Sequence, residues 1–356
     1  MNRFTWSLKG RVRWFPVTLR DKWINRQWQS RAKRFLVVRH AARKPYFYGQ
    51  FLSFVAENYP ELRRLFELHL LPCRLRDPSM YRLQIPWMQD PLEEWSPRGY
   101  RQAVQLQNDC DHHGIPTINR VDRHKNASKL EGACRIARAG LRTPRMAPIA
   151  DIQAFRENLC GFELPLLIRE NYGHGGTNFV VRSPADVAEI PWDKFRCPLA
   201  VEFVDVSNPR DGTCVRYRFF AGGDVGFSHS VHVSLGWEVR GGTRVNSNLA
   251  DNAEYDYLTS SNPHRAQFLE ARELLGLDLV AFDYSYDRDG KIVVWEANPH
   301  PLVVLSTKNK RAHARWLTDR AFALMLSCYL QKAGMDLPQG LREFTEGQVQ
   351  SLTKAA

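Results

Sequence analysis

The sequence has no long apolar run, no paired cysteines and no internal repeat. Its longest apolar stretch, Ala321 to Leu330, is about half the ~20 residues that a membrane-spanning helix needs. The seven cysteines include no Cys-x-x-Cys pair, so their spacing predicts neither a disulfide framework nor a zinc site. No segment has the apolar core of a secretory signal, although composition leaves an organellar transit peptide open. We therefore expect a cytoplasmic protein in a reducing compartment.

Acidic residues are nearly missing from the N-terminal segment, residues 1–44. This basic arm contains thirteen Lys or Arg and one acid, Asp21, so it accounts for the whole net charge of +12. It also contains four tryptophans: Trp6, Trp14, Trp23 and Trp28. One interpretation is attachment to an acidic partner or an acidic membrane surface, with the protein peripheral to the membrane. We favour the other, an arm that packs its tryptophans on the body, because no clean amphipathic period is present. No specific nucleic-acid recognition is expected.

The overall composition is that of an ordinary globular protein, with 44% apolar and 25% charged residues. Its 356 residues suffice for two or three compact units. Between the arm and Asp122, short apolar strands alternate with helical spacing, which predicts an α/β unit with a largely parallel sheet. The predicted strands are 35–38, 67–71 and 83–87, the predicted helices are 47–58 and 98–113, and a loop marked by Pro86, Pro91 and Pro97 interrupts them.

A second pattern begins at Asn126. We predict that Asn126 caps a helix with Lys129 in its first turn and Gly140 at its end. The predicted buried face of this helix contains Leu130, Cys134 and Ile136. Strands are then predicted at 164–170, 178–182, 199–205, 214–221 and 225–234, helices at 264–275 and roughly 308–333, and a peripheral tail at 334–356.

Residues 282–299 contain the most informative pattern, Phe-Asp-Tyr-Ser-Tyr-Asp-Arg-Asp-Gly-Lys-Ile-Val-Val-Trp-Glu-Ala-Asn-Pro. Apolar, β-branched and aromatic residues flank Asp-Arg-Asp-Gly turn chemistry, which predicts a β-hairpin. Glu296 and Asn298 are two apart and share a face. With a two-residue turn, Asp283 faces the same side, diagonally across from Glu296. Three such oxygen ligands suit magnesium. A hairpin with a merely polar outer face is the alternative.

Four other motifs contain residues suited to phosphate, adenine or an oxyanion. Lys129 places an ammonium near a helix N-terminus. Arg169 precedes a glycine-rich loop, Tyr172 to Thr177, whose backbone can approach phosphates. The other two are Ala200-Val201-Glu202-Phe203-Val204-Asp205 and Arg218-Phe219-Phe220-Ala221-Gly222-Gly223-Asp224, with Arg216 on the strand face of Arg218. Each motif alone has an ordinary structural explanation.

In this order, the motifs resemble those of the ATP-grasp domain. This is the fold of carboxylate–amine ligases such as D-alanine–D-alanine ligase, glutathione synthetase and the ribosomal-protein glutamate ligases. The resemblance covers residues 120–305 and continues weakly upstream. It implies an α/β ATP-grasp fold with an N-terminal α/β pre-ATP-grasp domain. The implied divisions are the arm at 1–44, the pre-ATP-grasp domain at 45–122 with its first strand near 35–39, ATP-grasp subdomains at 123–196 and 197–333, and the tail at 334–356.

The resemblance also implies a reaction and its cofactors. ATP, with Mg²⁺ or Mn²⁺, would activate a carboxylate as an acyl phosphate, and an amine would attack it to give an amide, ADP and phosphate. Arg218 would meet the γ-phosphate or the oxyanion, and Arg169 stands where the family usually has a lysine. The implied ATP contacts are Lys129, Arg169, Gly173, His174, Gly175 and Gly176 for phosphates, Glu202, Phe203 and Val204 for adenine, and Asp205 for ribose. The implied metal ligands are Asp283, Glu296 and Asn298.

The substrates are small-molecule or peptide carboxylates and amines on this interpretation. His229, Trp237 and Arg244 lie in a stretch that the family places near the acceptor. His229 and His232 are three apart, which predicts opposite strand faces and no shared metal. Lys308, Arg311 and Arg315 form a basic stripe at i, i+3 and i+7, which either holds an acidic substrate or is solvated. Two alternatives remain, an ATP-grasp kinase acting on a non-carboxylate acceptor and a degenerate ATP-binding module tethered by the basic arm.

Overall fold

The computed structural model describes residues 33–40, 48–88, 92–173, 178–239, 248–301 and 313–353, with a few isolated positions elsewhere. Most of the basic arm lies outside these residues, so its two interpretations remain predictions. Trp23 is an exception, and its 60% exposure argues against packing of this indole on the body. Among the described helices, none is both long and apolar enough to cross a membrane.

The N-terminal unit is built on a three-stranded parallel sheet in the order β2-β1-β3, as predicted. Its strands are β1 (Arg34–His40), β2 (Phe66–Leu71) and β3 (Tyr81–Trp87). Along β1, Phe35 and Val37 face one hydrophobic cluster while Leu36 and Val38 face another. Burial on both faces explains why this strand is a continuous apolar run. The surrounding helices are α3 (Tyr48–Asn58), α4 (Pro60–Arg63), α5 (Leu92–Trp95) and α6 (Pro97–His112), with a 3₁₀ turn, η1, at Pro78–Met80.

The predicted proline-marked loop is wrong in part. Pro86 lies inside β3, and α5 occupies part of the segment between Pro91 and Pro97. Because β3 lies at the edge of its sheet, a proline there need not remove a ladder hydrogen bond.

The helix after Asn126 starts later than predicted. Residues Val121–Ala127 form a 3₁₀ segment, η2, and α7 runs from Lys129 to Arg138 with Ser128 as its N-cap. Asn126 instead donates through Nδ2 to the Leu275 carbonyl at 2.8 Å, a tertiary contact that competes with capping. Cys134 is exposed, and the buried side of α7 is formed by Gly132, Ala133 and Ile136.

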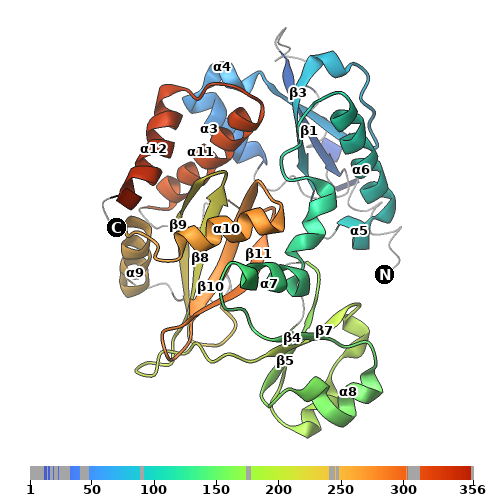
Figure 1. The fold of residues 1–356 in the computed structure, drawn as a ribbon, viewed down its shortest axis with the longest axis vertical. Helices are drawn as coiled ribbons and strands as arrows, with labels where there is room; N and C mark the ends of the chain where they lie inside the picture. Colours follow the sequence, from blue (N-terminus) through green and yellow to red (C-terminus); the bar gives the residue numbers. More distant parts are fainter. Residues whose placement is uncertain are drawn as a thin grey trace.

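A smaller antiparallel sheet has the order β4-β7-β5-β6 and extends from the rest of the molecule at the bottom of Figure 1. Its strands are β4 (Met146–Pro148), β5 (Leu166–Glu170), β6 (Asn178–Val181) and β7 (Pro198–Glu202). One face packs on α8 (Ile152–Asn158) and the turns η3 (Leu159–Gly161), η4 (Pro184–Glu189) and η5 (Trp192–Lys194), through residues such as Ile168 and Ala200. The other face presents Leu167, Leu199 and Val201.

A larger antiparallel sheet has the order β11-β10-β8-β9. Its strands are β8 (Cys214–Gly222), β9 (Val225–Ser234), β10 (Leu279–Tyr286) and β11 (Ile292–Asn298). On one face, α7 and α10 (Arg265–Leu275) pack on alternate residues such as Phe219 and Phe282 (Figure 1). Phe220 and Ala281 face the opposite side, toward the cluster that contains α11 (Ala314–Lys332). We refer to this second side as the α11 face.

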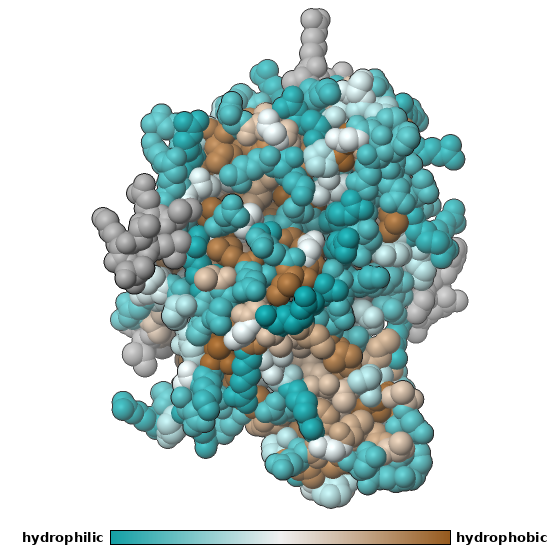
Figure 2. Space-filling view, viewed as in Figure 1, coloured by the Kyte–Doolittle hydropathy of each residue, from teal (hydrophilic) through white to brown (hydrophobic). Residues whose placement is uncertain are grey.

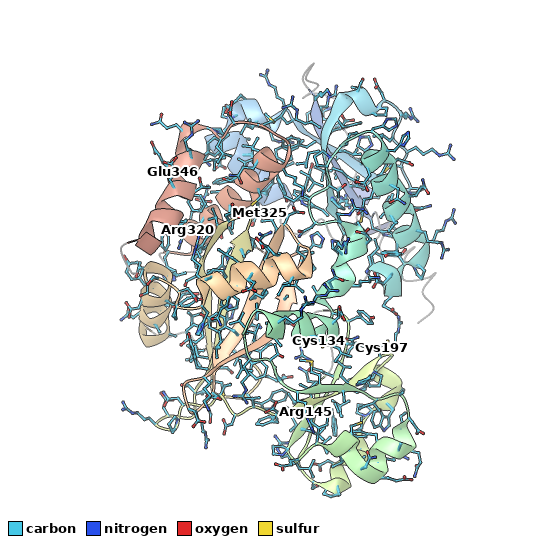
Figure 3. The ribbon with its side chains drawn as sticks, viewed as in Figure 1. Cys134, Arg145, Cys197, Arg320, Met325 and Glu346 are labelled. Carbon is cyan, nitrogen blue, oxygen red and sulfur yellow. The ribbon has the colours of Figure 1, made fainter. Side chains whose placement is uncertain are left out.

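Two further helices cover the edge of the larger sheet. α9 (Asn248–Thr259) packs on β9, and α12 (Gln339–Thr353) packs on α11 and β9. Figure 3 shows Arg320 of α11 and Glu346 of α12 on these neighbouring helices. The predicted peripheral tail is therefore wrong for residues 339–353, and Leu341 within it is fully buried. On the side seen in Figure 2, the surface is mostly hydrophilic, with hydrophobic side chains in scattered groups.

Candidate nucleotide and metal site

Four polar residues form a row across the larger sheet. Register partners run from Ser230 on β9 to Arg218 on β8, Asp283 on β10 and Glu296 on β11. Directly paired residues share one face, so all four side chains lie on the α11 face. Our expectation of a diagonal arrangement of Asp283 and Glu296 is wrong, because five residues, Asp287 to Lys291, separate the strands and Trp295 forms a bulge. The observed pairing brings the two carboxylates closer than a diagonal would.

Asp283 is held by two arginines. Arg218 donates to it from Nε at 2.6 Å and from Nη2 at 2.8 Å, and Arg216 Nη1 lies 3.6 Å away. The carboxylate is only 1% exposed. Burial acts to raise the pKa of Asp283, but the charges of Arg218 and Arg216 outweigh it, so the pKa lies below its usual range. The third guanidinium nitrogen of Arg218, Nη1, takes no part in this pair and can donate elsewhere.

Glu296 and Asn298 lie together at the end of β11. Asn298 Nδ2 is 3.5 Å from Glu296 Oε1, and Arg169 Nη2 is 3.5 Å from Glu296 Oε2. Arg169 comes from β5 of the smaller sheet, so this ion pair joins the two sheets. Arg169, which stands where the resemblance implies a lysine, therefore makes a contact with a predicted metal ligand.

The donor set of these three residues fits a hard cation. Carboxylate and amide oxygens are the ligands that magnesium prefers. The Arg218 fork uses one acceptor position on each Asp283 oxygen, and each oxygen has a second. In the described part of the chain, no group of three His, Cys, Asp or Glu could hold a metal. A cation at the predicted site would therefore take Asp283 and Glu296 as its acidic ligands and the amide of Asn298 as the third protein ligand.

Lys129, the predicted phosphate contact, lies at the start of α7. Its Nζ donates to the Gly173 carbonyl at 2.7 Å, and its side chain is mostly buried. Asn171 holds the two segments together, because its carbonyl accepts from Lys129 N and its side chain accepts from Leu130 N, both at 3.1 Å. Gly173 has a φ of 82°, which favours glycine. His174, Gly175 and Gly176 lie outside the described residues, so their predicted role stays a prediction.

The segment after β7 differs from our prediction in two respects. The strand ends at Glu202 rather than at Asp205. Glu202 is the register partner of Leu166 on β5, its N–H donates to the Arg145 carbonyl at 2.9 Å, and its side chain accepts from Arg145 N at 2.8 Å. Arg145, labelled in Figure 3, precedes β4. Phe203 and Val204 follow this strand and make no backbone hydrogen bond to another described residue, so their contact with an adenine edge stays a prediction. Asp205 binds Ser207 N at 2.9 Å and Arg288 at 2.8 Å, so a ribose would have to displace a surface contact.

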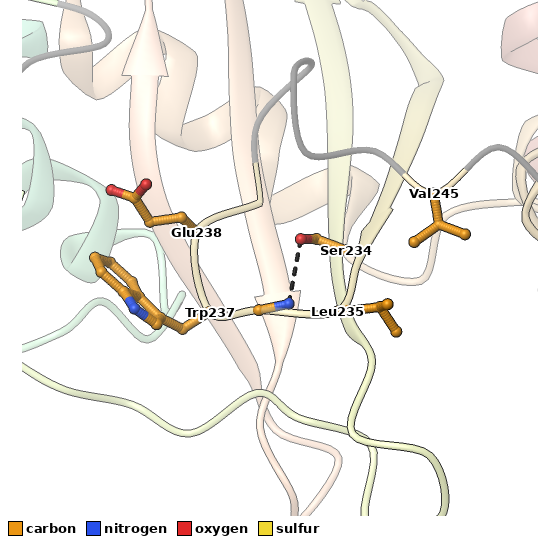
Figure 4. A pocket seen from close by; sticks show the side chains of 6 residues that line it. Ser234, Leu235, Trp237, Glu238 and Val245 are labelled. Atoms are coloured by element: carbon orange, nitrogen blue, oxygen red, sulfur yellow. Dashed lines mark hydrogen bonds between the residues drawn. The ribbon is translucent and has the colours of Figure 1, made fainter.

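An apolar surface lies beside this segment. Trp237 packs edge-on against Phe203, with ring centroids 6.3 Å apart. The same cluster contains Leu130, Met146, Leu167, Val180, Leu199 and Val201. Trp237 and Glu238 lie on one side of their turn and Leu235 and Val245 on the other, around a hollow of about 390 Å³ (Figure 4). Glu238 accepts from Asn178 of β6 at 3.3 Å. The structure thus places Trp237 against the predicted adenine segment.

The other predicted substrate residues have different outcomes. His229 lies on the α11 face of β9 and is buried. The expectation that His229 and His232 occupy opposite faces is wrong, because His229 is an extra residue in a bulge and His232 pairs opposite Arg216. Arg244, Lys308 and Arg311 lie outside the described residues. Arg315 is exposed and pairs with Glu57 and Asp319, as expected of a solvated face.

Asn119 is a positioning residue whose role the sequence did not reveal. Its Nδ2 donates to the carbonyls of Leu279 and Pro299, both at 2.7 Å, and its Oδ1 accepts from the N–H groups of Asp278 and Leu279. It therefore joins the start of β10 to the residue after Asn298. Its φ of 51° is uncommon for a residue other than glycine. No local pattern indicates these long-range contacts.

Comparisons with known proteins bear on the fold. No family model and no curated protein matches the sequence. The chain is similar in structure to the ATP-grasp ligase PsnB complexed with its minimal precursor, with 13% identity, coverage of 83% of this chain and 99% of that chain, and a TM-score of 0.51. It is also similar to the VanG D-Ala:D-Ser ligase of Enterococcus faecalis, with 12% identity, coverage of 84% of this chain and 100% of that chain, and a TM-score of 0.52. A third similar structure is the ADP complex of N5-carboxyaminoimidazole ribonucleotide synthetase. It has 11% identity, coverage of 86% of this chain and 78% of that chain, and a TM-score of 0.52. The chain has the ATP-grasp fold.

Proposed function

We propose that this protein is an ATP-dependent carboxylate–amine ligase that releases ADP and phosphate. The observation that carries the proposal is the row of Arg218, Asp283 and Glu296 across the larger sheet, with Arg169 reaching it from the smaller sheet. Structural neighbours described as ATP-grasp ligases, one of them solved with Mg and ADP, support the same kind of reaction.

The charge of the site suits a polyphosphate. Among the described residues, the predicted phosphate and metal contacts comprise four cations, Lys129, Arg169, Arg216 and Arg218, and two acids, Asp283 and Glu296. In a partly buried site, this excess of cations would attract ATP and its leaving groups. The apolar surface with Phe203 and Trp237 would take the adenine. The planar base would be covered on one side by an aromatic ring, while Phe203 and Val204 offer backbone groups to its edge.

The reaction requires positioning more than covalent chemistry by side chains. A carboxylate oxygen of the substrate forms a bond to the γ-phosphorus as the bond to ADP breaks, and ADP leaves with the electron pair. The amine nitrogen then bonds to the acyl carbon, phosphate leaves with its electron pair, and the amine loses a proton to solvent. Arg218 Nη1 would donate to the oxyanion of the second step. Asp283, Glu296 and Asn298 would hold magnesium, which when bound neutralises phosphate charge.

One observation favours a second candidate, an ATP-binding module that does not turn over. Glu296 is paired with Arg169, and Asp283 with Arg218, so both predicted acidic ligands are engaged. If those pairs persist with nucleotide, the positive charges of Arg218 and Arg169 beside the two carboxylates weaken metal binding. ADP release in the presence of pooled carboxylates and amines distinguishes the two, because only the ligase produces it.

The direct test is calorimetric titration of ATP with and without magnesium. We expect magnesium to strengthen ATP binding to the native chain and Glu296→Gln to abolish this effect. Asp289→Ala is the matched control, because Asp289 lies in the exposed turn of the same hairpin and its side chain pairs with the exposed Lys291, at 3.8 Å. The proposal fails if the native chain binds no ATP, or if Glu296→Gln and Asp289→Ala behave alike.

A further inference from the structure

His229 is a buried histidine without a hydrogen bond at either ring nitrogen to any described residue. The residue is only 8% exposed. Its ring packs beside those of Phe220 and Phe227, with centroid distances of 5.6 and 6.4 Å. Buried polar groups in folded proteins are nearly always hydrogen bonded. An imidazole in this position therefore needs an explanation beyond packing.

The backbone places this ring beside the polar row. Arg218 pairs with Ser230, and Phe219 pairs with Ser228, so His229 is the additional residue of a β-bulge on β9. Phe220, which His229 contacts, is two residues beyond Arg218 and shares its face. Bulges frequently re-aim a side chain next to a functional site. The bulge turns His229 toward the α11 face. Ser230, the next residue of β9, pairs with Arg218.

Burial and the charged groups around His229 keep its ring neutral. Burial, then the nearby charges of Arg218 and Arg320, lower the pKa of His229 to about 3, with a smaller effect of His232 and an opposing one of Asp283. Arg320 comes from α11 and stacks over the Phe227 ring at 4.4 Å. A neutral imidazole has one N–H donor and one acceptor nitrogen. At neutral pH the ring can therefore donate a hydrogen bond but is a very weak base.

We propose that His229 donates a hydrogen bond to an anionic substrate oxygen held beside Arg218, either on the transferred phosphoryl group or on the attacked acyl carbon. This inference rests on the proposed ligase function. Two donors from neighbouring strands, one cationic and one neutral, would bind the developing negative charge. The neutral donor adds a directional contact without a further charge in a site that already has excess cations.

The test uses the full chain and inorganic phosphate as the probe, added to the MgADP complex. Binding of MgADP and of phosphate is measured by calorimetry for the native chain, His229→Asn and His229→Phe. Asparagine retains an N–H donor and phenylalanine removes it. His113→Phe, at the exposed end of α6, is the control for loss of a surface imidazole. The ¹⁵N signals of His229, assigned by their loss in His229→Asn, are followed from pH 5.5 to 8.5 with and without phosphate.

We expect MgADP binding to be unchanged in all variants. Phosphate binding should weaken by about tenfold or more in His229→Phe and by about threefold or less in His229→Asn, because the donor is lost only in the first. The His229 ring should stay neutral throughout, and its N–H signal should move when phosphate binds. The thermal midpoint of His229→Phe should equal or exceed that of the native chain, since an unpaired buried polar group is removed.

Three results would overturn the inference while leaving the ligase proposal intact. They are normal phosphate binding to the MgADP complex of His229→Phe, no response of the ring signal to phosphate, or phosphate binding that follows protonation of His229. Absence of MgADP binding to the native chain would instead overturn the ligase proposal, and the role of His229 with it.

Discussion

The carboxylate of Asp283 accepts both Nε–H and Nη2–H of Arg218, at 2.6 and 2.8 Å, in the middle of the larger sheet. Strand pairing sets this contact, because the two residues are register partners on β10 and β8. The ion pair serves structure and site at once. It compensates the charges of Arg218 and of the buried Asp283, and it orients Nη1 of Arg218.

The first prediction separates these two effects. Asp283→Ala should lower the free energy of unfolding by about 3–5 kcal/mol, because it leaves Arg218 buried without its partner. The double variant Arg218→Met/Asp283→Leu should recover most of this loss by apolar packing but should not turn over ATP. Urea denaturation and ADP release measure the two quantities. A double variant as unstable as Asp283→Ala would show that the pair itself, rather than the isolated charge, decides stability.

A second prediction concerns pH and the N-terminal sheet. Burial acts to raise the pKa of Glu67, but hydrogen bonds and charges from His69 and Arg34 lower it to about 2. Because the folded pKa is below the ordinary value of roughly 4.3, this group stabilises the fold above that value, and the contribution is lost as pH falls toward 2. Glu67→Gln should flatten the dependence of the urea midpoint on pH between about 2.5 and 5 relative to the native chain. Parallel curves for the two proteins would contradict the assignment.

The third prediction tests Asn119. Its four hydrogen bonds join the start of β10 to Pro299, next to Asn298. Asn119→Ala should lower the free energy of unfolding by about 2–4 kcal/mol, because buried backbone groups lose partners and alanine is strained at positive φ. Asn119→Gly loses the same hydrogen bonds without the strain, so it should be the more stable variant. Chemical denaturation gives both values, and equal stability of the two variants would remove the strain from the explanation.

The fourth prediction concerns the proposed contact between Trp237 and the adenine of ATP. Trp237→Ala should weaken ATP binding by about tenfold, a typical effect of losing an aromatic contact with a base. Trp316→Ala is the control, since Trp316 is an exposed tryptophan on α11 that stacks under Arg320. Calorimetry of ATP binding provides the readout. Equal ATP affinity of Trp237→Ala and Trp316→Ala would remove Trp237 from the nucleotide site.

Elements whose structure depends on near neighbours could be predicted from the sequence. The hairpin of β10 and β11 follows from alternating apolar residues around Asp-Arg-Asp-Gly, and Gly290 has the positive φ that such a turn uses. The parallel N-terminal sheet follows from apolar runs separated by helices. The cap at Asn126 was wrong, because a side chain with two possible partners took the Leu275 carbonyl instead of the helix N-terminus.

The bulges at Trp295 and His229 had no sequence signal. An inserted residue changes which side chains are opposite each other, yet it leaves the apolar alternation almost intact on either side. Both bulges alter the site. One brings Glu296 directly opposite Asp283, and the other puts His229 on the α11 face.

The sequence by itself determined which residue types could take part and which strand each belongs to, because strand periodicity and turn chemistry are local. Only the tertiary structure decided their partners. Arg169 meets Glu296, and Trp237 meets Phe203, because the fold brings together segments that are distant along the chain. Such contacts depend on how whole layers pack and on where bulges shift the strand register. No short segment of the sequence determines either of these.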